Sequence, residues 1–199
     1  MFERFRNRPE QVVSGKDRLP PGQHEVKDWP VLHAGSIPPC DKRTWDFKVF
    51  GLVEKPIRLT WDGFLALPRV TITSDIHCVT TWSRFDNVWE GVSTQEILKL
   101  ASPKPEARFV IAHCEYGYNA NLPLETLAGD DCLLATHHDG KLLAPEHGYP
   151  LRLVVPKFYF WKSAKWVRGI ELLDRDKRGF WEVRGYSNTA DPWTEDRYS

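Results

Sequence analysis

The stretch SDIHCVTTWSRFDNVWEGV, residues 74–92, carries the main chemical signal of the chain. The β-branched run just before it predicts a strand that ends at Cys78, and we expect a polar, aromatic loop to follow. A lone cysteine is more often a buried, inert residue than a ligand. The polar residues on both sides of Cys78 favour the other interpretation, in which its thiolate binds a metal that accepts sulfur.

A second stretch, EHGYPLRLVVPKFYFWKSAKWVRGIEL at residues 146–172, predicts an anion site. Gly148 and Pro150 indicate a tight turn before a strand that begins at Arg152. Lys162, Ser163 and Lys165 follow on the next turn. Arginine, lysine and serine together can hold a phosphate, although a solvated basic edge strand would have the same composition.

The rest of the chain predicts short strands mixed with helices of one to three turns. Thr60 and Ser93 are candidate N-caps, and Ser93 with Glu96 forms a capping box. Strands are expected in residues 45–52, 70–78, 108–116, 131–143, 149–156, 165–173 and 180–186. Without regular βαβ units this mixture indicates an α+β fold in a single domain, residues 29–199, preceded by an extended N-terminal arm, residues 1–28.

The composition of the chain bears on its class of function and on its location in the cell. The 27 basic residues equal the 27 acidic residues, so nothing favours nucleic-acid binding. The N-terminus has no apolar segment typical of a secretory signal, and no run is long enough to span a membrane. We therefore expect a cytoplasmic protein, in which Cys40, Cys78, Cys114 and Cys132 are thiols.

Four ordered segments resemble the molybdopterin-binding domain of the sulfite-oxidase family. They are HCVTTWS with the later WEGV, then HGYPLRLVVP, then FWKSAKWV, and finally GFWEVRGYSNTADPW. The similarity extends over roughly residues 29–198. It is strongest to the small bacterial branch that includes the catalytic subunit of the periplasmic methionine-sulfoxide reductase.

The resemblance implies a mixed-sheet fold that binds molybdopterin and an enzyme that transfers an oxygen atom to or from a small substrate. In the family one cysteine thiolate binds molybdenum beside the two dithiolene sulfurs of the pterin, and Cys78 matches that cysteine. The resemblance also implies pterin or phosphate contacts for His33, His113, His147, Arg152, Ser163, Ala164 and Lys165.

Other features leave alternatives open. Arg84 is either a substrate contact or a surface ion-pair residue. Tyr118, with Tyr116, is expected at the cavity mouth or in a turn that packs on the core. The single arginine after Cys78, in place of the family's arginine-rich turn, makes sulfite a doubtful substrate. With no haem domain in the chain, we expect a separate electron-transfer partner.

Two other functions are alternatives to a molybdopterin-dependent oxidoreductase. A zinc-dependent hydrolase could use His77, Cys78, His113 and Cys114, but adjacent residues of a strand point to opposite faces, and no zinc-ligand spacing is present. A cofactor-free binding domain of the same fold is the other alternative. The histidine pair at residues 137–138 precedes Asp-Gly, which favours a hairpin turn over a metal site.

Overall fold

The computed structural model describes residues 17–199. Residues 1–16 of the expected N-terminal arm, residues 1–28, therefore lie outside the described residues. The described part of that arm contains β1 (His24–Glu25), which pairs in parallel with β5. It is therefore attached to the edge of a sheet before the chain reaches Trp29.

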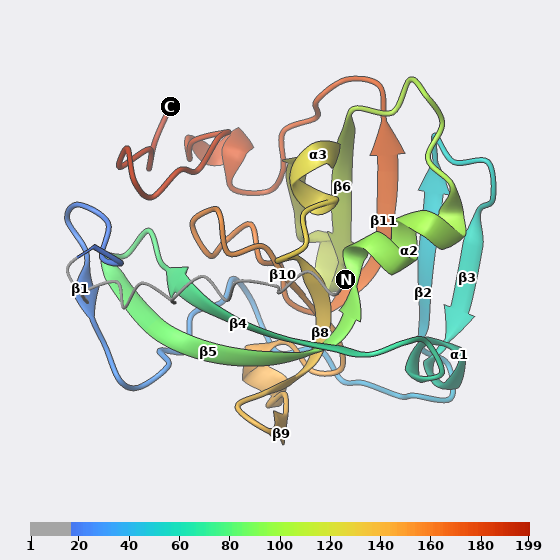
Figure 1. The fold of residues 1–199 in the computed structure, drawn as a ribbon, viewed down its shortest axis with the longest axis horizontal. Coiled ribbons are helices and arrows are strands. Elements are labelled where there is room, and N and C mark those ends of the chain that lie inside the picture. The colour runs from blue at the N-terminus through green and yellow to red at the C-terminus, as the bar shows by residue number, and fades with distance from the viewer. Residues whose placement is uncertain (1–16) are drawn as a thin grey trace, which may run out of the picture.

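Two mixed sheets form the framework (Figure 1). The six-stranded sheet has the order β1-β5-β8-β10, with β4 also paired to β5 and β9 to β8. Its further strands are β4 (Val70–His77), β5 (Trp82–Ser93), β8 (Leu133–His138), β9 (Lys141–Leu142) and β10 (Arg152–Val154).

The five-stranded sheet has the order β3-β2-β11-β6-β7. Only the β2–β11 pair is parallel in this sheet; the other neighbours are antiparallel. Its strands are β2 (Asp46–Gly51), β3 (Ile57–Thr60), β6 (Phe109–Cys114), β7 (Asn119–Pro123) and β11 (Val167–Leu173).

Three short helices connect the strands: α1 (Trp61–Leu65), α2 (Thr94–Ala101) and α3 (Leu124–Leu127). Both predicted caps are present. The Thr60 side chain accepts a hydrogen bond from the Gly63 N–H, and that of Ser93 accepts one from the Glu96 N–H. Single 3₁₀ turns lie at Glu115–Gly117, Pro145–His147 and Glu182–Arg184.

Two clusters of buried side chains pack this framework. The larger joins β2, α1, α2 and the five-stranded sheet, with Phe47, Ile97 and Ile170 fully buried. The smaller contains Cys78, Trp82 and Trp89 together with Val154 of β10. Arg152 is the first residue of this core strand, and the 158–166 loop lies between β10 and β11, so buried strands position both.

The expected fold class is confirmed, but two element predictions are wrong. Residues 82–93 form a strand, β5, the longest in the described chain, instead of the expected loop. They pair with β4 in antiparallel orientation, and polar side chains flank the buried Trp89 along the strand. Residues 180–186 form a 3₁₀ turn rather than a strand.

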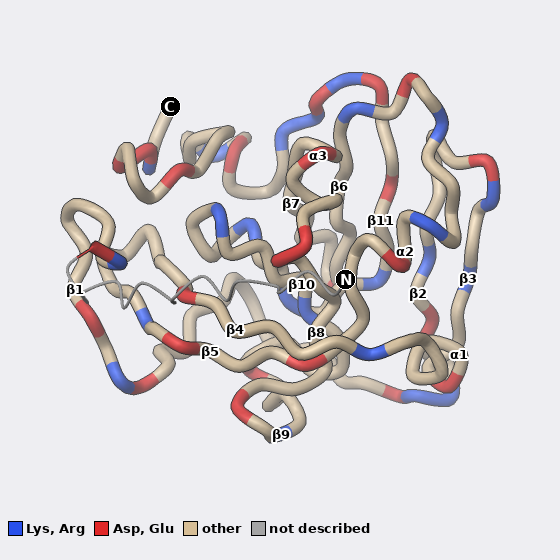
Figure 2. Tube along the Cα trace, viewed as in Figure 1, with Lys and Arg blue, Asp and Glu red and all other residues tan. Residues whose placement is uncertain are grey.

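Charged residues are interspersed over both sheets, with Lys and Arg lying near Asp and Glu throughout the trace (Figure 2). Within residues 17–199, no helix combines the length and apolar character needed to cross a bilayer.

Candidate active site

A cavity of about 470 Å³ opens where the smaller core cluster meets the 158–166 loop. Segments far apart in sequence supply its wall: residues 29–35, the turn after β4, the turn after β6, the 158–166 loop and the C-terminal segment. The predicted residues that line it are His33, Cys78, Tyr118, Arg152, Ser163, Ala164 and Lys165. Seven of the ten predicted site residues are thus gathered around one space.

Cys78 lies at the start of a tight turn between β4 and β5. Its N–H donates to the Trp82 carbonyl at 2.8 Å, and the Thr81 N–H donates back to the Cys78 carbonyl at 3.0 Å. The Gln23 side-chain amide donates to the same carbonyl at 3.1 Å. These bonds fix the cysteine backbone, so the direction of its thiol is determined by the turn.

The Cys78 sulfur faces the cavity, with Thr80 Oγ1 at 3.1 Å. Burial raises the pKa of this thiol, and the Thr80 hydrogen bond and the positive charge of Arg152 offset part of that increase. In the cofactor-free protein the group is therefore a thiol. A metal that binds there must displace the proton.

Arg152 is a buried cation with few partners. Arg152 is 2% exposed, and among the described residues its guanidinium donates one hydrogen bond, from Nη1 to the His147 carbonyl at 2.9 Å. Nε is buried and unpartnered among the described residues, and no carboxylate there pairs with the guanidinium. Burial lowers its pKa to about 9. A desolvated, uncompensated guanidinium at a cavity wall is suited to bind an anion.

Lys165 provides a second cation at the same wall. Its Nζ donates to the carbonyls of Leu32 and Glu146, at 2.6 and 2.7 Å, and pairs with no carboxylate of residues 17–199. Burial, followed by the charge of Arg152, lowers its pKa to about 7. Gly148 makes this approach possible: its φ is +114°, and a Cβ there would lie 3.2 Å from the Cβ atoms of both cations.

The two remaining predicted histidines near the cavity differ. His33 lines it, and its Nδ1 lies 2.8 Å from the Gly35 carbonyl. His147 is not a lining residue: its ring stacks on Trp29 with centroids 3.8 Å apart, and its Nδ1 is buried without a partner in the described chain. Burial and the charge of Arg152 lower the His147 pKa to about 4.

Two predicted hydroxyl donors are already engaged. The Ser163 hydroxyl accepts from the Val155 N–H at 2.9 Å, so it ties the 158–166 loop to the end of β10 rather than facing the cavity freely. The Tyr118 hydroxyl donates to the Trp161 carbonyl at 2.8 Å. Tyr118 lines the cavity and also packs against the larger core cluster, so it combines features of both alternatives. Tyr116 lines the cavity and is exposed.

Arg84 and His113 lie away from the cavity. Arg84 on β5 pairs with Asp139 at 2.6 Å, which agrees with the surface ion-pair alternative. His113 on β6 lies 2.9 Å from Glu171 and stacks against Phe50. Alternation along β6 explains this correction, because Cys114 points to the core and His113 to the opposite face.

Nothing favours the zinc alternative. No group of three or more potential metal ligands occurs among the histidines, cysteines and carboxylates of the described chain. The residues 139–140 form the expected turn between β8 and β9, with Gly140 at a φ of +73°.

Much of the wall was not predicted as site. It consists mainly of aromatic side chains: Trp29, Trp82, Phe160, Trp161, Trp166, Phe180, Trp181 and Tyr186. The available signal is the unusual count of nine tryptophans, together with the FWEVRGY sequence, for which a strand is the prediction.

Comparison with known proteins shows which protein family this chain matches. The model of the oxidoreductase molybdopterin-binding domain matches residues 34–181. The uncharacterized oxidoreductase YuiH of Bacillus subtilis is 47% identical over 183 residues, which cover 92% of each chain. The methionine-sulfoxide reductase catalytic subunit MsrP of Campylobacter jejuni is 29% identical, over 70% of this chain and 52% of that protein.

Among solved structures, the sulfane dehydrogenase SoxCD from Paracoccus pantotrophus has a similar fold. The TM-score is 0.62 at 24% sequence identity, over 88% of this chain and 56% of that chain. The chain thus matches almost the whole of the Bacillus protein but only about half of these larger relatives.

Proposed function

The chain belongs to the oxidoreductase molybdopterin-binding family, and on this basis we propose that it transfers an oxygen atom to or from a small substrate, with the Cys78 thiolate as the protein ligand to molybdenum. The protein is an oxidoreductase whose family binds molybdopterin. The ligand role of Cys78, the substrate and the site residues are the proposed part.

One observation carries the proposal: a buried and a half-buried cation, neither with a carboxylate partner in the described chain, share a cavity with a buried cysteine. Arg152 Nε has no partner there and Lys165 Nζ donates only to two carbonyls, so an anion is the partner that both cations lack. A phosphate-bearing pterin whose metal accepts sulfur would satisfy both cations and Cys78. The residues present therefore fit this cofactor.

Each side chain has a defined part in holding it. Arg152 and Lys165 would bind the phosphate, and His33 would contact the pterin from the 29–35 segment. The turn after β4 would present the Cys78 sulfur in one orientation, since its carbonyl and N–H are both hydrogen-bonded. Ser163 and Ala164 would shape the site through the backbone of their loop.

When bound, molybdopterin supplies a metal centre that exchanges two electrons as an oxygen atom is transferred. The chain supplies binding, orientation and exclusion of water. The aromatic side chains of the cavity lining would limit the access of water to the space beside Cys78, and this would strengthen the electrostatic interactions inside.

We propose a cytoplasmic location, supported by the four cysteines, all free thiols in the described chain. We also propose a separate protein or small carrier as the electron partner, since one of the similar proteins is named as the catalytic subunit of a reductase. Fractionation of the native host, with an antibody against the protein, tests the location.

Metal and pterin analysis tests the function. Protein produced in a host that makes the cofactor should contain molybdenum near one equivalent per chain and release a fluorescent oxidised pterin. Zinc in its place would support the hydrolase alternative, and neither metal would support a cofactor-free binding domain. Either result would overturn the proposal.

A further inference from the structure

The C-terminal segment, residues 174–199, forms one side of the cavity although it contains no strand longer than a single bridge. It contributes Phe180, Trp181 and Tyr186, and the 158–166 loop contributes Trp161. We call these four residues the aromatic wall.

The rings of the aromatic wall contact one another continuously. The Phe180 and Trp181 centroids are 5.2 Å apart, those of Trp181 and Tyr186 are 4.9 Å apart, and those of Trp161 and Tyr186 are 5.3 Å apart. All four side chains also line the cavity. The result is a single apolar surface beside the proposed cofactor site.

Charge on the cavity lining determines what this surface can accept. The cations that line it, Arg152 and Lys165, are both assigned to the cofactor phosphate. The lining carboxylate, Glu115, is paired with Arg168 at 2.5 Å. No cation of the described lining is left for an anionic substrate, and burying an unpaired anion against aromatic rings is unfavourable.

We propose that the aromatic wall is the substrate-binding surface and that the substrate is uncharged, with an apolar or aromatic body. This inference rests on the proposed function and concerns recognition by that site. Aromatic rings pack favourably on other rings and on apolar groups, whereas they give an anion such as sulfite or nitrate no compensating hydrogen bond.

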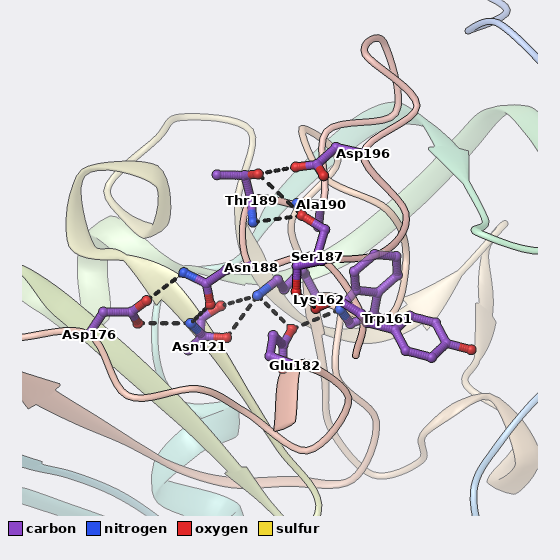
Figure 3. A network of polar contacts seen from close by, with 12 residues as sticks. Asn121, Trp161, Lys162, Asp176, Glu182, Ser187, Asn188, Thr189, Ala190 and Asp196 are labelled. Carbon is purple, nitrogen blue, oxygen red and sulfur yellow. Dashed lines mark hydrogen bonds and ion pairs between the residues drawn. The ribbon is translucent and has the colours of Figure 1, made fainter. Parts of the chain in front are cut away.

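A buried ion pair holds the two parts of the wall together (Figure 3). Lys162 and Glu182 are each 1% exposed, and Lys162 Nζ lies 2.7 Å from Glu182 Oε1. The same carboxylate oxygen accepts a hydrogen bond from Trp161 Nε1 at 2.8 Å. Glu182 thus connects the Trp161 side of the wall to the turn that carries Phe180 and Trp181.

Further contacts anchor the pair to β7. Lys162 Nζ also donates to the carbonyl and the side-chain oxygen of Asn121, at 3.0 and 2.8 Å. Asn121 Nδ2 in turn donates to Asp176 and Asn188, each at 2.8 Å (Figure 3). The ammonium group therefore has three acceptors, and the C-terminal segment is held at three residues, Asp176, Glu182 and Asn188. Lys162 and Glu182 are positioning residues for the wall.

A binding measurement that does not depend on turnover tests the proposal. Molybdenum and pterin content is determined first; a wild type that contains neither overturns the proposed function and, with it, this proposal. The loaded protein is then titrated with pyridine N-oxide and, as a matched anion, with nicotinate N-oxide, and tryptophan fluorescence gives each dissociation constant. We expect at least tenfold tighter binding of the uncharged probe. Equal or tighter binding of the anion overturns the proposal.

Two variants locate the binding surface. Trp181→Ala should weaken binding of pyridine N-oxide about tenfold at unchanged molybdenum content, whereas Trp193→Ala, at an exposed tryptophan outside the lining, should leave it unchanged. Loss of molybdenum from Trp181→Ala would mean that the wall holds the cofactor, which contradicts the proposal.

Glu182→Gln tests the positioning role. It keeps the acceptor for Trp161 but removes the charge that faces Lys162, so the loosened wall should raise the dissociation constant of pyridine N-oxide at unchanged molybdenum content. Unchanged affinity in this folded variant would contradict a positioning role for Glu182. Trp181→Ala tests the wall independently if Glu182→Gln does not fold.

Discussion

Arg152 is the residue whose environment is hardest to explain without a bound anion. Its guanidinium lies 4.0 Å from the centre of the Phe160 ring, inside the core edge, with no carboxylate among the described residues to compensate it. A buried charge that lacks a partner destabilises the protein that carries it. Selection would remove such a residue unless another molecule completed the site.

Arg152→Met should therefore separate cofactor retention from folding. We expect molybdenum content to fall at least tenfold, while the unfolding free energy of the cofactor-free protein decreases by less than about 1 kcal/mol or increases, because an apolar chain replaces an uncompensated charge. Metal analysis and urea denaturation measure the two effects.

Arg168→Met is the matched control. Arg168 pairs with Asp46 and Glu115. Its loss leaves Glu115 without its ion pair, whereas Asp46 keeps Arg58 and Lys48, so the variant should cost about 1 kcal/mol of stability at unchanged molybdenum content. If Arg152→Met kept full molybdenum, the assignment of the phosphate site would be wrong.

Lys165 predicts a pH dependence in the cofactor-free protein. Its pKa of about 7 means that the ammonium form predominates at pH 6 and the neutral amine at pH 8.5. Sulfate stays a dianion over this range, so its affinity should fall severalfold as the pH rises from 6 to 8.5. Calorimetric titration with sulfate measures this change.

The lowered pKa of Lys165 also makes the stability of the folded protein depend on pH. The unfolded chain keeps an ordinary lysine pKa, so above pH 7 it binds more protons than the folded state, and the contribution of Lys165 to the unfolding free energy increases with pH. Lys165→Met should abolish the pH dependence of sulfate binding, whereas Lys48→Met, at an exposed lysine, should preserve it. Sulfate affinity that does not change with pH in the wild type would refute the role of Lys165.

At the level of single residues, the sequence predicted Cys78, Arg152 and Lys165 as site residues from a recognisable strand or turn beside each, and all three line the cavity. It placed Arg84 and His113 less well, because their positions depend on which strand face points to the cavity. The aromatic wall could not be predicted, since Trp161 and Trp181 meet only after two irregular segments are folded together.

Gly91 is the critical point of the longest element, β5. A Cβ at this position would lie 2.0 Å from the Leu134 carbonyl oxygen and 2.8 Å from the Ala135 Cα, both backbone atoms of β8. The register between β5 and β8 also shifts between Glu90 and Gly91. The strand can approach its neighbour this closely only with glycine.

Gly91→Ala should accordingly cost about 2–4 kcal/mol of unfolding free energy, because backbone rather than a flexible side chain must move. Gly140→Ala, where a Cβ meets nothing within 4 Å but φ is +73°, should cost about 1 kcal/mol. Chemical denaturation compares them. Equal costs would show that β8 yields easily at Gly91.

Elements were predicted well where hydrophobic period or a cap determined them, as in α1, α2, β4 and β11. Prediction failed where tertiary pairing decided the outcome. The polar residues of β5 form a strand because β4 and β8 pair with them. The sequence FWEVRGY forms a turn, in which Glu182 is buried and makes an ion pair with Lys162.

At the scale of the whole molecule, the cavity is lined mainly by segments that are distant in the sequence and lie outside the strands of the two sheets. Residues 29–35, the turn after Cys78, the 158–166 loop and the C-terminal segment meet around it, while β3 and α2 lie on the other side of the framework (Figure 1). Cofactor binding should thus stabilise the first group selectively.

Hydrogen exchange tests this expectation. Relative to cofactor-free protein, the loaded protein should exchange at least tenfold more slowly in residues 29–35, 78–82, 160–166 and 180–186, with no change in β3 and α2. Mass spectrometry of peptides measures each segment. Uniform protection over the whole chain would indicate general stabilisation instead of a cavity-centred site.

The ligand role of the Cys78 sulfur is the central claim, and X-ray absorption at the molybdenum edge tests it most directly. The wild type should show one more sulfur neighbour to molybdenum than Cys78→Ser, which keeps the metal through Arg152 and Lys165, and Cys40→Ser should match the wild type. The same number of sulfur neighbours in wild type and Cys78→Ser would contradict the account.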